Sequence, residues 1–324
     1  MKFKIAILLF IILTSQKSFA QELPLILDKP GTFQILSRTD YTLPECGFTK
    51  AEMTANLQKL TELVGIMCKN PVLRDPVGFD GRARIYNTIN CKEYGAYGVP
   101  SRISFEFAAW HKKKDGTPAR GFIEPPEWSL IINKIHPTGY QFSADDISAD
   151  LRYFIVPLQK VTIEPGIDEY DGECYILYNP NRPPYWVSVT VKEVFIALID
   201  HIKNDFDKIA RDFILDLVEK EYAATSAEEF SKPAYYGGGQ PMSVISSDDQ
   251  NPPILRVNPD YWDKSLPKSS IQFIYFRMIN NRPFLKSNTA EYLQHNSISY
   301  HLARFEESLD INMVRSLVPL IGKK

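Results

Sequence analysis

Strand-like segments in this chain cluster together instead of alternating one for one with helices, and this order is the strongest constraint on its fold. Alternating polar and apolar residues predict strands at 82–86 and 102–110, and the following Asp115-Gly116 dipeptide is typical of a hairpin. A capping box and helical apolar spacing predict a first helix over 49–67. A parallel doubly wound sheet needs regular alternation. We therefore expect an α+β fold, with an antiparallel sheet packed against a long helix and a smaller C-terminal α+β unit.

The clearest helical signal covers residues 190–223. Thr190 and Glu193 have capping-box spacing, and apolar residues recur after them every three or four positions. The pattern breaks at 205–207, so it predicts one long amphipathic helix or two nearly collinear ones. Further strands are predicted at 121–123, 128–132, 153–156, 159–163, 174–178, 254–257 and 271–278, and further helices at 143–151, 289–307 and 312–317.

Residues 225–253 are rich in Ser, Pro and Gly and have almost no apolar periodicity. So long a stretch without secondary structure is unusual within a compact domain. We predict a linker or mobile loop there, between a main α+β domain at 21–224 and a C-terminal α+β unit at 254–324.

The first twenty residues have the pattern of a secretory signal peptide. Lys2 and Lys4 precede a run of nine apolar residues, and Ser18 and Ala20 supply small residues at a cleavage site. Nine helical residues span only about 14 Å, less than half of a bilayer core. We expect cleavage after Ala20 and a soluble mature protein without a transmembrane segment, either secreted or periplasmic.

Charge and motif content exclude several classes of function. With 37 basic and 39 acidic residues, the formal net charge of -2 offers no field for nucleic acid. The sequence contains none of the signatures typical of a serine-hydrolase elbow, a zinc protease or a phosphate-binding loop. It therefore predicts no cofactor and no metal site, and it identifies no catalytic residue.

Export would place the four cysteines in an oxidising compartment, where an even number favours two disulfides. A bond between Cys46 and Cys68 is disfavoured, because the intervening helix separates its ends by roughly 25 Å. Two pairings remain open: Cys46 with Cys91 and Cys68 with Cys174, or Cys46 with Cys174 and Cys68 with Cys91. We favour the second, since Cys68 and Cys91 flank one loop. Buried thiols are the alternative.

Two proline–aromatic segments, 124–128 and 182–186, are the best candidates for a ligand-binding surface. Prolines hold a loop extended, and an aromatic ring on it can stack on a sugar or a peptide. The candidate residues are Arg182, Tyr185, Trp186 and Trp128. The competing interpretation makes both tryptophans core residues. We expect Trp186 to be buried, with Arg182 and Tyr185 more exposed.

Acidic residues and histidines give weaker signals. The carboxylates within 164–173 are interpreted as a solvated turn between two strands. An acid–base hydrolase would use carboxylates near Glu124, Glu127 or this cluster. His295 and His301 are expected at the surface.

Three stretches resemble a set found in exported bacterial proteins with no established activity. They are Asn70-Pro-Val-Leu-Arg with Gly78-Phe-Asp, then Asn179 to Glu193, and then Asn258-Pro-Asp-Tyr-Trp with Leu266-Pro-Lys-Ser. The resemblance implies bacterial export and one architecture that continues through 225–253. It implies no catalytic residue.

Three functional hypotheses follow. The first is a binding or scaffold protein of the bacterial envelope or exterior, whose partner is a glycan or peptide. The second is a secreted hydrolase that uses Asp and Glu on glycan or peptide. The third is a purely structural partner protein. A pocket with paired carboxylates would favour the hydrolase, and an aromatic groove without them would favour binding.

Overall fold

The fold is known from a computed structural model of the 324-residue chain. It describes residues 24–38, 47–87, 97–121, 125–135, 139–141, 155–157, 159–205, 208–236, 245–246, 251–278 and 300–323. The expected signal peptide, Cys46, Cys91, Glu124, His295 and the helix expected at 143–151 lie outside these residues.

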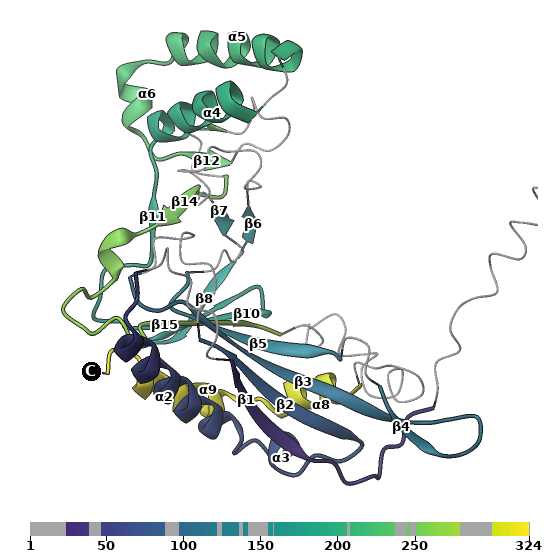
Figure 1. Cartoon of the computed structure of the whole chain (residues 1–324). Helices are drawn as coiled ribbons and strands as arrows, with labels where there is room; N and C mark the ends of the chain where they lie inside the picture. Colours follow the sequence, from purple (N-terminus) through teal and green to yellow (C-terminus); the bar gives the residue numbers. More distant parts are fainter. Residues whose placement is uncertain are drawn as a thin grey trace, which may run out of the picture.

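The protein has a mixed α+β fold, as predicted, built on a nine-stranded sheet (Figure 1). The strand order is β1-β2-β3-β5-β15-β10-β9-β8, and β4 pairs with β3. All pairs are antiparallel except β1 with β2. The strands are β1 Phe33–Arg38, β2 Phe79–Tyr86, β3 Ser101–Lys112, β4 Pro118–Arg120, β5 Glu127–Ile132, β8 Lys160–Glu164, β9 Ile167–Tyr170, β10 Cys174–Tyr178 and β15 Phe273–Arg277.

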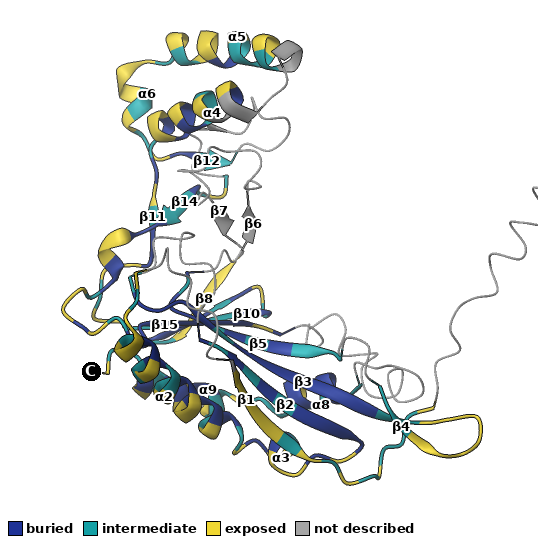
Figure 2. Cartoon of the chain, viewed as in Figure 1, coloured by how far each residue is buried: buried dark blue, intermediate teal, exposed yellow. Residues whose placement is uncertain are grey.

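Helices from both ends of the chain cover one face of this sheet: α2 Lys50–Met67, α3 Pro71–Arg74, α8 Tyr300–Ser308 and α9 Ile311–Leu317 (Figures 1 and 2). The predicted capping box is present, because Thr49 Oγ1 accepts from the Glu52 amide while Glu52 accepts from the Thr49 amide. Leu60, Leu63 and Val64 of α2 are fully buried against the strands. This interface is the main core.

The 190–223 region forms a helical hairpin, so the predicted single or nearly collinear helix is wrong. Helix α4 Val191–Asp205 and helix α5 Lys208–Ala224 lie side by side (Figure 1), and Lys203 pairs with Glu219 at 3.1 Å. The Phe195 and Tyr222 rings also meet, at 5.8 Å between centroids. Each helix has an apolar stripe of its own, and folding back buries both stripes at once.

A second, four-stranded sheet joins this hairpin to the main sheet (Figure 1). Its order is β11-β14-β7-β6, with β11 Trp186–Ser188, β14 Leu255–Val257, β7 Ile155–Pro157 and β6 Gly139–Gln141. Between its strands in the sequence come α6 Ala227–Ser231 and the pair β12 Tyr235–Tyr236 with β13 Ile245–Ser246. The expected linker at 225–253 thus contains secondary structure within its described part.

Strands from either side of 225–253 share both sheets. β15 lies between β5 and β10 in the main sheet, and β14 lies between β11 and β7 in the second sheet. The described part of 254–324 therefore completes sheets begun by the earlier chain. The proposed domain boundaries remain a prediction.

No disulfide forms within the described part of the chain, and Cys68 has a free thiol, so its favoured bond to Cys91 is contradicted. A bond between Cys68 and Cys174 is contradicted, since Cys68 packs against the helix-covered face of the sheet and Cys174 points to the opposite face. Cys174 Sγ instead lies 3.6 Å from the Tyr275 hydroxyl. Burial raises the pKa of the Cys68 thiol.

The expectation that His301 lies at the surface is wrong, because its side chain on α8 is fully buried. Its ring lies 4.8 Å from that of Phe79, and neither ring nitrogen has a hydrogen-bond partner. Burial, reinforced by the nearby Arg304 cation, lowers the pKa of His301 to about 4.

None of the helices among the described residues is long and apolar enough to span a bilayer.

Candidate functional site

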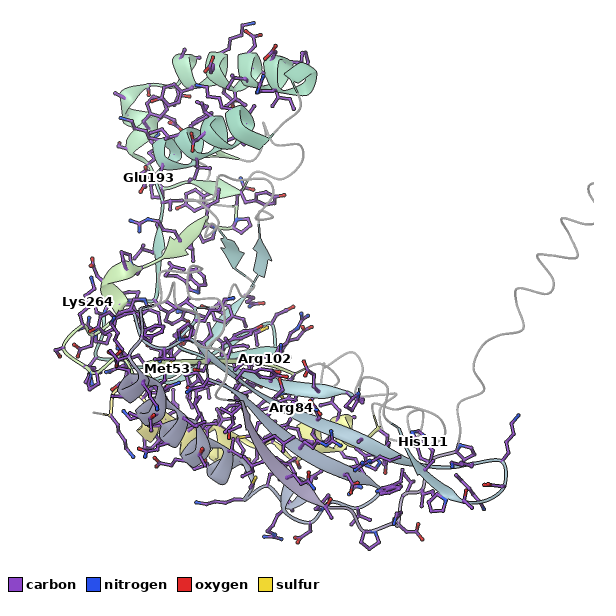
Figure 3. All side chains as sticks on the ribbon, in the orientation of Figure 1. Met53, Arg84, Arg102, His111, Glu193 and Lys264 are labelled. Carbon is purple, nitrogen blue, oxygen red and sulfur yellow. The ribbon has the colours of Figure 1, made fainter. Side chains whose placement is uncertain are left out.

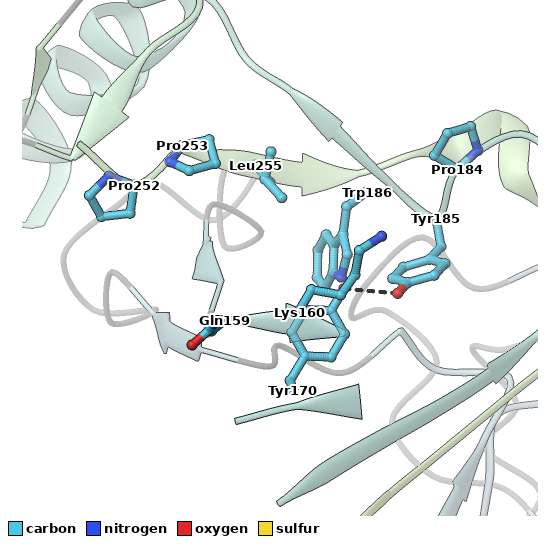
Figure 4. Close-up of a pocket in the computed structure, with 9 residues that line it drawn as sticks. All are labelled: Gln159, Lys160, Tyr170, Pro184, Tyr185, Trp186, Pro252, Pro253 and Leu255. Atoms are coloured by element: carbon cyan, nitrogen blue, oxygen red, sulfur yellow. Dashed lines mark hydrogen bonds between the residues drawn. The ribbon is translucent and has the colours of Figure 1, made fainter. Parts of the chain in front are cut away.

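A pocket of about 580 Å³ opens where the main sheet meets the second sheet (Figure 4). It has a size typical of ligand pockets, and aromatic rings and prolines dominate its wall. The lining residues are Gln159, Lys160, Tyr170, Pro184, Tyr185, Trp186, Pro252, Pro253 and Leu255. Two candidates from the sequence, Tyr185 and Trp186, are therefore at a pocket.

The proline–aromatic segment is held in place by residues that follow β14. Asn258 Nδ2 donates to the Pro184 carbonyl at 2.7 Å, and the Asn258 amide donates to the Tyr185 carbonyl at 2.9 Å. Trp186 then begins β11 and pairs with Val257. Hydrogen bonds from Asn258 and the pairing of β11 with β14 thus hold this wall of the pocket in place.

Arg182 has a structural position beside the pocket and does not line it. Its guanidinium donates to the carbonyls of Tyr261 at 2.8 Å and of Asp260 and Trp262, both at 2.9 Å. Three convergent carbonyls suit a planar guanidinium with several donors. Arg182 therefore ties the segment to the turn after β14.

A hydrogen-bonded network lies beneath the aromatic wall. The buried Asp168 of β9 accepts from the Tyr185 hydroxyl and from Thr162 Oγ1, the latter at 2.7 Å. The Tyr170 and Tyr185 hydroxyls are 2.8 Å apart. Burial and this network raise the pKa of Tyr185 far above its usual value, so Tyr185 remains a neutral donor with its hydroxyl occupied.

Lys160 supplies the one cation in the described lining. Its Nζ lies 3.6 Å from Asp168 Oδ2, and half of its side chain is exposed. Trp186 is only 7% exposed, and its indole N–H has no hydrogen-bond partner. Buried donors are normally satisfied, so this enclosed N–H is an unsatisfied donor, as are those of Trp128 and Trp262.

Tyr185 is 5% exposed, so the expectation of a more exposed tyrosine is wrong. It packs at 5.6 Å against the Phe273 ring and donates to Asp168. Trp186 is buried, as expected, and Arg182 is half-buried.

Trp128 does not join the other candidates. It is 1% exposed and points into the main core, where its ring contacts those of Phe276 and Phe305 at 5.1 and 5.3 Å. Trp186 belongs to a different apolar cluster on the opposite side of the sheet. The structure therefore separates the two proline–aromatic segments.

The carboxylates within 164–173 form a strand and ion pairs in place of the expected turn. β9 Ile167–Tyr170 lies between turns at Gly166 and Asp171, both with positive φ. Glu164 pairs with Arg315 at 3.0 Å, and Glu173 pairs with Arg277 at 2.8 Å. These acids stabilise the sheet edge and do not line the 580 Å³ pocket.

A carboxylate pair lies on the face of the main sheet opposite to α2 and α8. Glu127 is directly opposite Glu106 across β3 and β5. Arg102 pairs with Glu127, and Arg84 pairs with Glu106. Both arginines are labelled in Figure 3. Each acid thus has an arginine partner, which favours a structural role for the pair. The described residues contain no group of three or more metal-ligating side chains.

Sequence reasoning missed Lys160, Tyr170, Pro252 and Pro253 as pocket residues, and it placed the buried Asp168 in a solvated turn. The four-residue strand β9 could have been recognised from the turn residues at both of its ends. No local signal reveals that Pro252 and Pro253 approach Trp186, because that contact joins segments more than sixty residues apart in the sequence.

Comparison of the chain with protein-family models, with curated proteins and with solved structures finds no match in any of the three.

Proposed function

We propose that this chain is an exported binding protein of the bacterial envelope or exterior, whose ligand occupies the pocket beside Trp186. The observation that carries the proposal is a preformed pocket whose wall combines aromatic rings with prolines. A wall already fixed by Asn258 and Arg182 loses little entropy when a ligand binds. Tyrosine and tryptophan supply large contact area with few rotatable bonds.

The composition of the pocket supports binding over hydrolysis. Its described lining has one lysine and no carboxylate, whereas acid–base hydrolysis of a glycosidic bond uses two carboxyl groups about 5–10 Å apart that flank the bond. The nearest acid, Asp168, is 1% exposed and lies behind Tyr185.

Ligand titration followed by calorimetry tests this proposal. Soluble peptidoglycan fragments and short peptides are titrated into the mature protein and into two matched variants, Trp186→Phe and Trp128→Phe. Each variant removes one unpartnered indole N–H, but only Trp186 lines the pocket. We expect Trp186→Phe to weaken binding about tenfold and Trp128→Phe to leave it unchanged. Equal effects of the two variants would exclude the pocket as the site.

Export is tested separately by intact-mass analysis of protein from the native host. We expect a mature chain that begins at Gln21, because the apolar run before it is too short to anchor the chain. A mass that includes residues 1–20 would contradict export by this route.

A further inference from the structure

The outer edge of β8 lies beside the Trp186 pocket, and no strand in the described part of the chain pairs with it. β8 is the last strand of the main sheet and pairs with β9 alone. Its register places Lys160 opposite Tyr170 and Thr162 opposite Asp168. The edge begins at Gln159 and Lys160, which line the pocket.

The hydrogen-bond pattern shows which backbone groups point outward. The Asp171 amide donates to the Gln159 carbonyl at 2.9 Å, which makes these two residues a hydrogen-bonded pair. In an antiparallel ladder such pairs alternate with pairs that make no mutual bond. Lys160 and Thr162 therefore direct their N–H and C=O groups away from β9, while Val161 bonds to Glu169.

The side chains of β8 are also accessible. Val161 is 52% exposed and Ile163 is 36% exposed. Ile163 lines a second hollow of about 390 Å³ with Glu169 and Tyr175, on the helix-covered face of the sheet. Pockets on alternate faces of an edge strand suit alternate side chains of an added strand.

The Trp186 pocket itself favours a peptide over a glycan. A bound sugar brings many hydroxyls that need partners, but the Tyr170 and Tyr185 hydroxyls are already bonded to each other, and Tyr185 also bonds to Asp168. The rest of the described wall is mainly ring and proline surface, which offers a sugar few hydrogen-bond partners. Apolar rings and prolines then contact an apolar or proline side chain.

We infer that the ligand is an extended polypeptide segment that adds as a strand to the outer edge of β8 and places one side chain in the Trp186 pocket. This inference rests on the proposed function of that pocket and specifies its ligand class. Main-chain bonds to Lys160 and Thr162 supply affinity that is independent of sequence, and the pocket supplies selectivity.

The first test measures amide hydrogen exchange at individual residues of the mature protein. The probe is a peptide of about ten residues, selected for binding from a random displayed library. The amides of Lys160 and Thr162 should exchange rapidly in the free protein and slow about tenfold or more when peptide saturates the site. The Val161 amide, already bonded to β9, is the internal control and should change little.

The second test compares Thr162→Pro with Thr162→Val. Both remove the hydroxyl that donates to Asp168, but only proline also removes the outward N–H. An edge strand tolerates proline where its N–H faces solvent. We expect Thr162→Pro to bind the selected peptide about tenfold more weakly than Thr162→Val does.

The outcomes separate this inference from the function on which it rests. Peptidoglycan fragments that bind through Trp186, with no peptide selected, would overturn the peptide inference and leave the binding function intact. Peptide binding without protection of Lys160 and Thr162 would overturn strand addition. If the Lys160 and Thr162 amides exchange more slowly when the protein is concentrated without peptide, a second copy of this chain occupies the edge. That result would also overturn the peptide inference. If neither ligand class binds, both proposals are wrong.

Discussion

Trp128 and Trp186 each follow a pair of prolines, in Pro-Pro-Glu-Trp and Pro-Pro-Tyr-Trp, yet they lie in different surroundings. Trp128 is on β5, between β3 and β15, and α8 covers it with Phe305. Trp186 is the first residue of β11, at the edge of a four-stranded sheet, and it lines a pocket. Strands that are distant in sequence decide whether the tryptophan lies in the core or lines a pocket.

The residues that precede the two tryptophans differ as well. Glu127 points to the face of the main sheet opposite to α8 and pairs with Arg102. Tyr185 points inward and bonds to Asp168. A buried acid thus fixes one wall of the pocket, whereas the corresponding position near Trp128 is part of a surface ion pair.

The largest effect is expected for Trp128→Ala. Its ring is enclosed by aromatic side chains, so truncation should lower the free energy of unfolding by about 3–5 kcal/mol. Urea denaturation measures the change, with Trp128→Phe as a milder control. A loss below about 1 kcal/mol would show that this site is not part of the cooperative core.

Trp186→Ala should cost about 3 kcal/mol, at the lower end of the same range. The ring is 7% exposed and borders an open pocket, so fewer packing contacts are lost than at Trp128. The same denaturation experiment gives the value. A melting temperature unchanged by Trp186→Ala would mean that this tryptophan contributes contact surface for a ligand and little to stability.

Acid should weaken the core around Trp128 through His301. Its pKa is lowered to about 4 in the folded chain against about 6.5 when unfolded, so the unfolded state binds more protons between these values. Stability is retained above about pH 6.5 and falls by up to about 3 kcal/mol as the pH drops to 4. His301→Phe should remove the part of the fall in unfolding free energy between pH 6.5 and 4 that is due to this histidine. Denaturation at several pH values measures the change.

Alkali should weaken the pocket wall through Tyr185. Its pKa in the folded chain is raised far above that of an unfolded tyrosine, so stability is retained below about pH 10 and falls as the pH rises further. Tyr185→Phe should reduce the slope above pH 10 by about 1.4 kcal/mol per pH unit and leave the acid slope unchanged. If Tyr185→Phe leaves the dependence of unfolding free energy on pH above 10 unchanged, Tyr185 has the same pKa in the folded and the unfolded chain.

Local sequence signals located most elements of the fold. The capping boxes at Thr49 and Thr190 mark the starts of α2 and α4, and the alternating segments correspond to β2 and β3. Such signals succeed because caps and periodicity depend on residues a few positions apart. The strand β9 was missed because its four residues are too few to show a period and its acids are typical of turns.

Packing between distant segments decided the rest. Folding back of α5 onto α4, the burial of His301 and the approach of Pro252 and Pro253 to Trp186 each join surfaces that no local pattern connects. The sequence by itself located α2, the start of α4, β2 and β3, and it indicated that residues 182–186 form a rigid aromatic segment. Only the tertiary structure made Trp186 part of a pocket and Trp128 part of the core, because burial of an apolar ring depends on which strands and helices cover it.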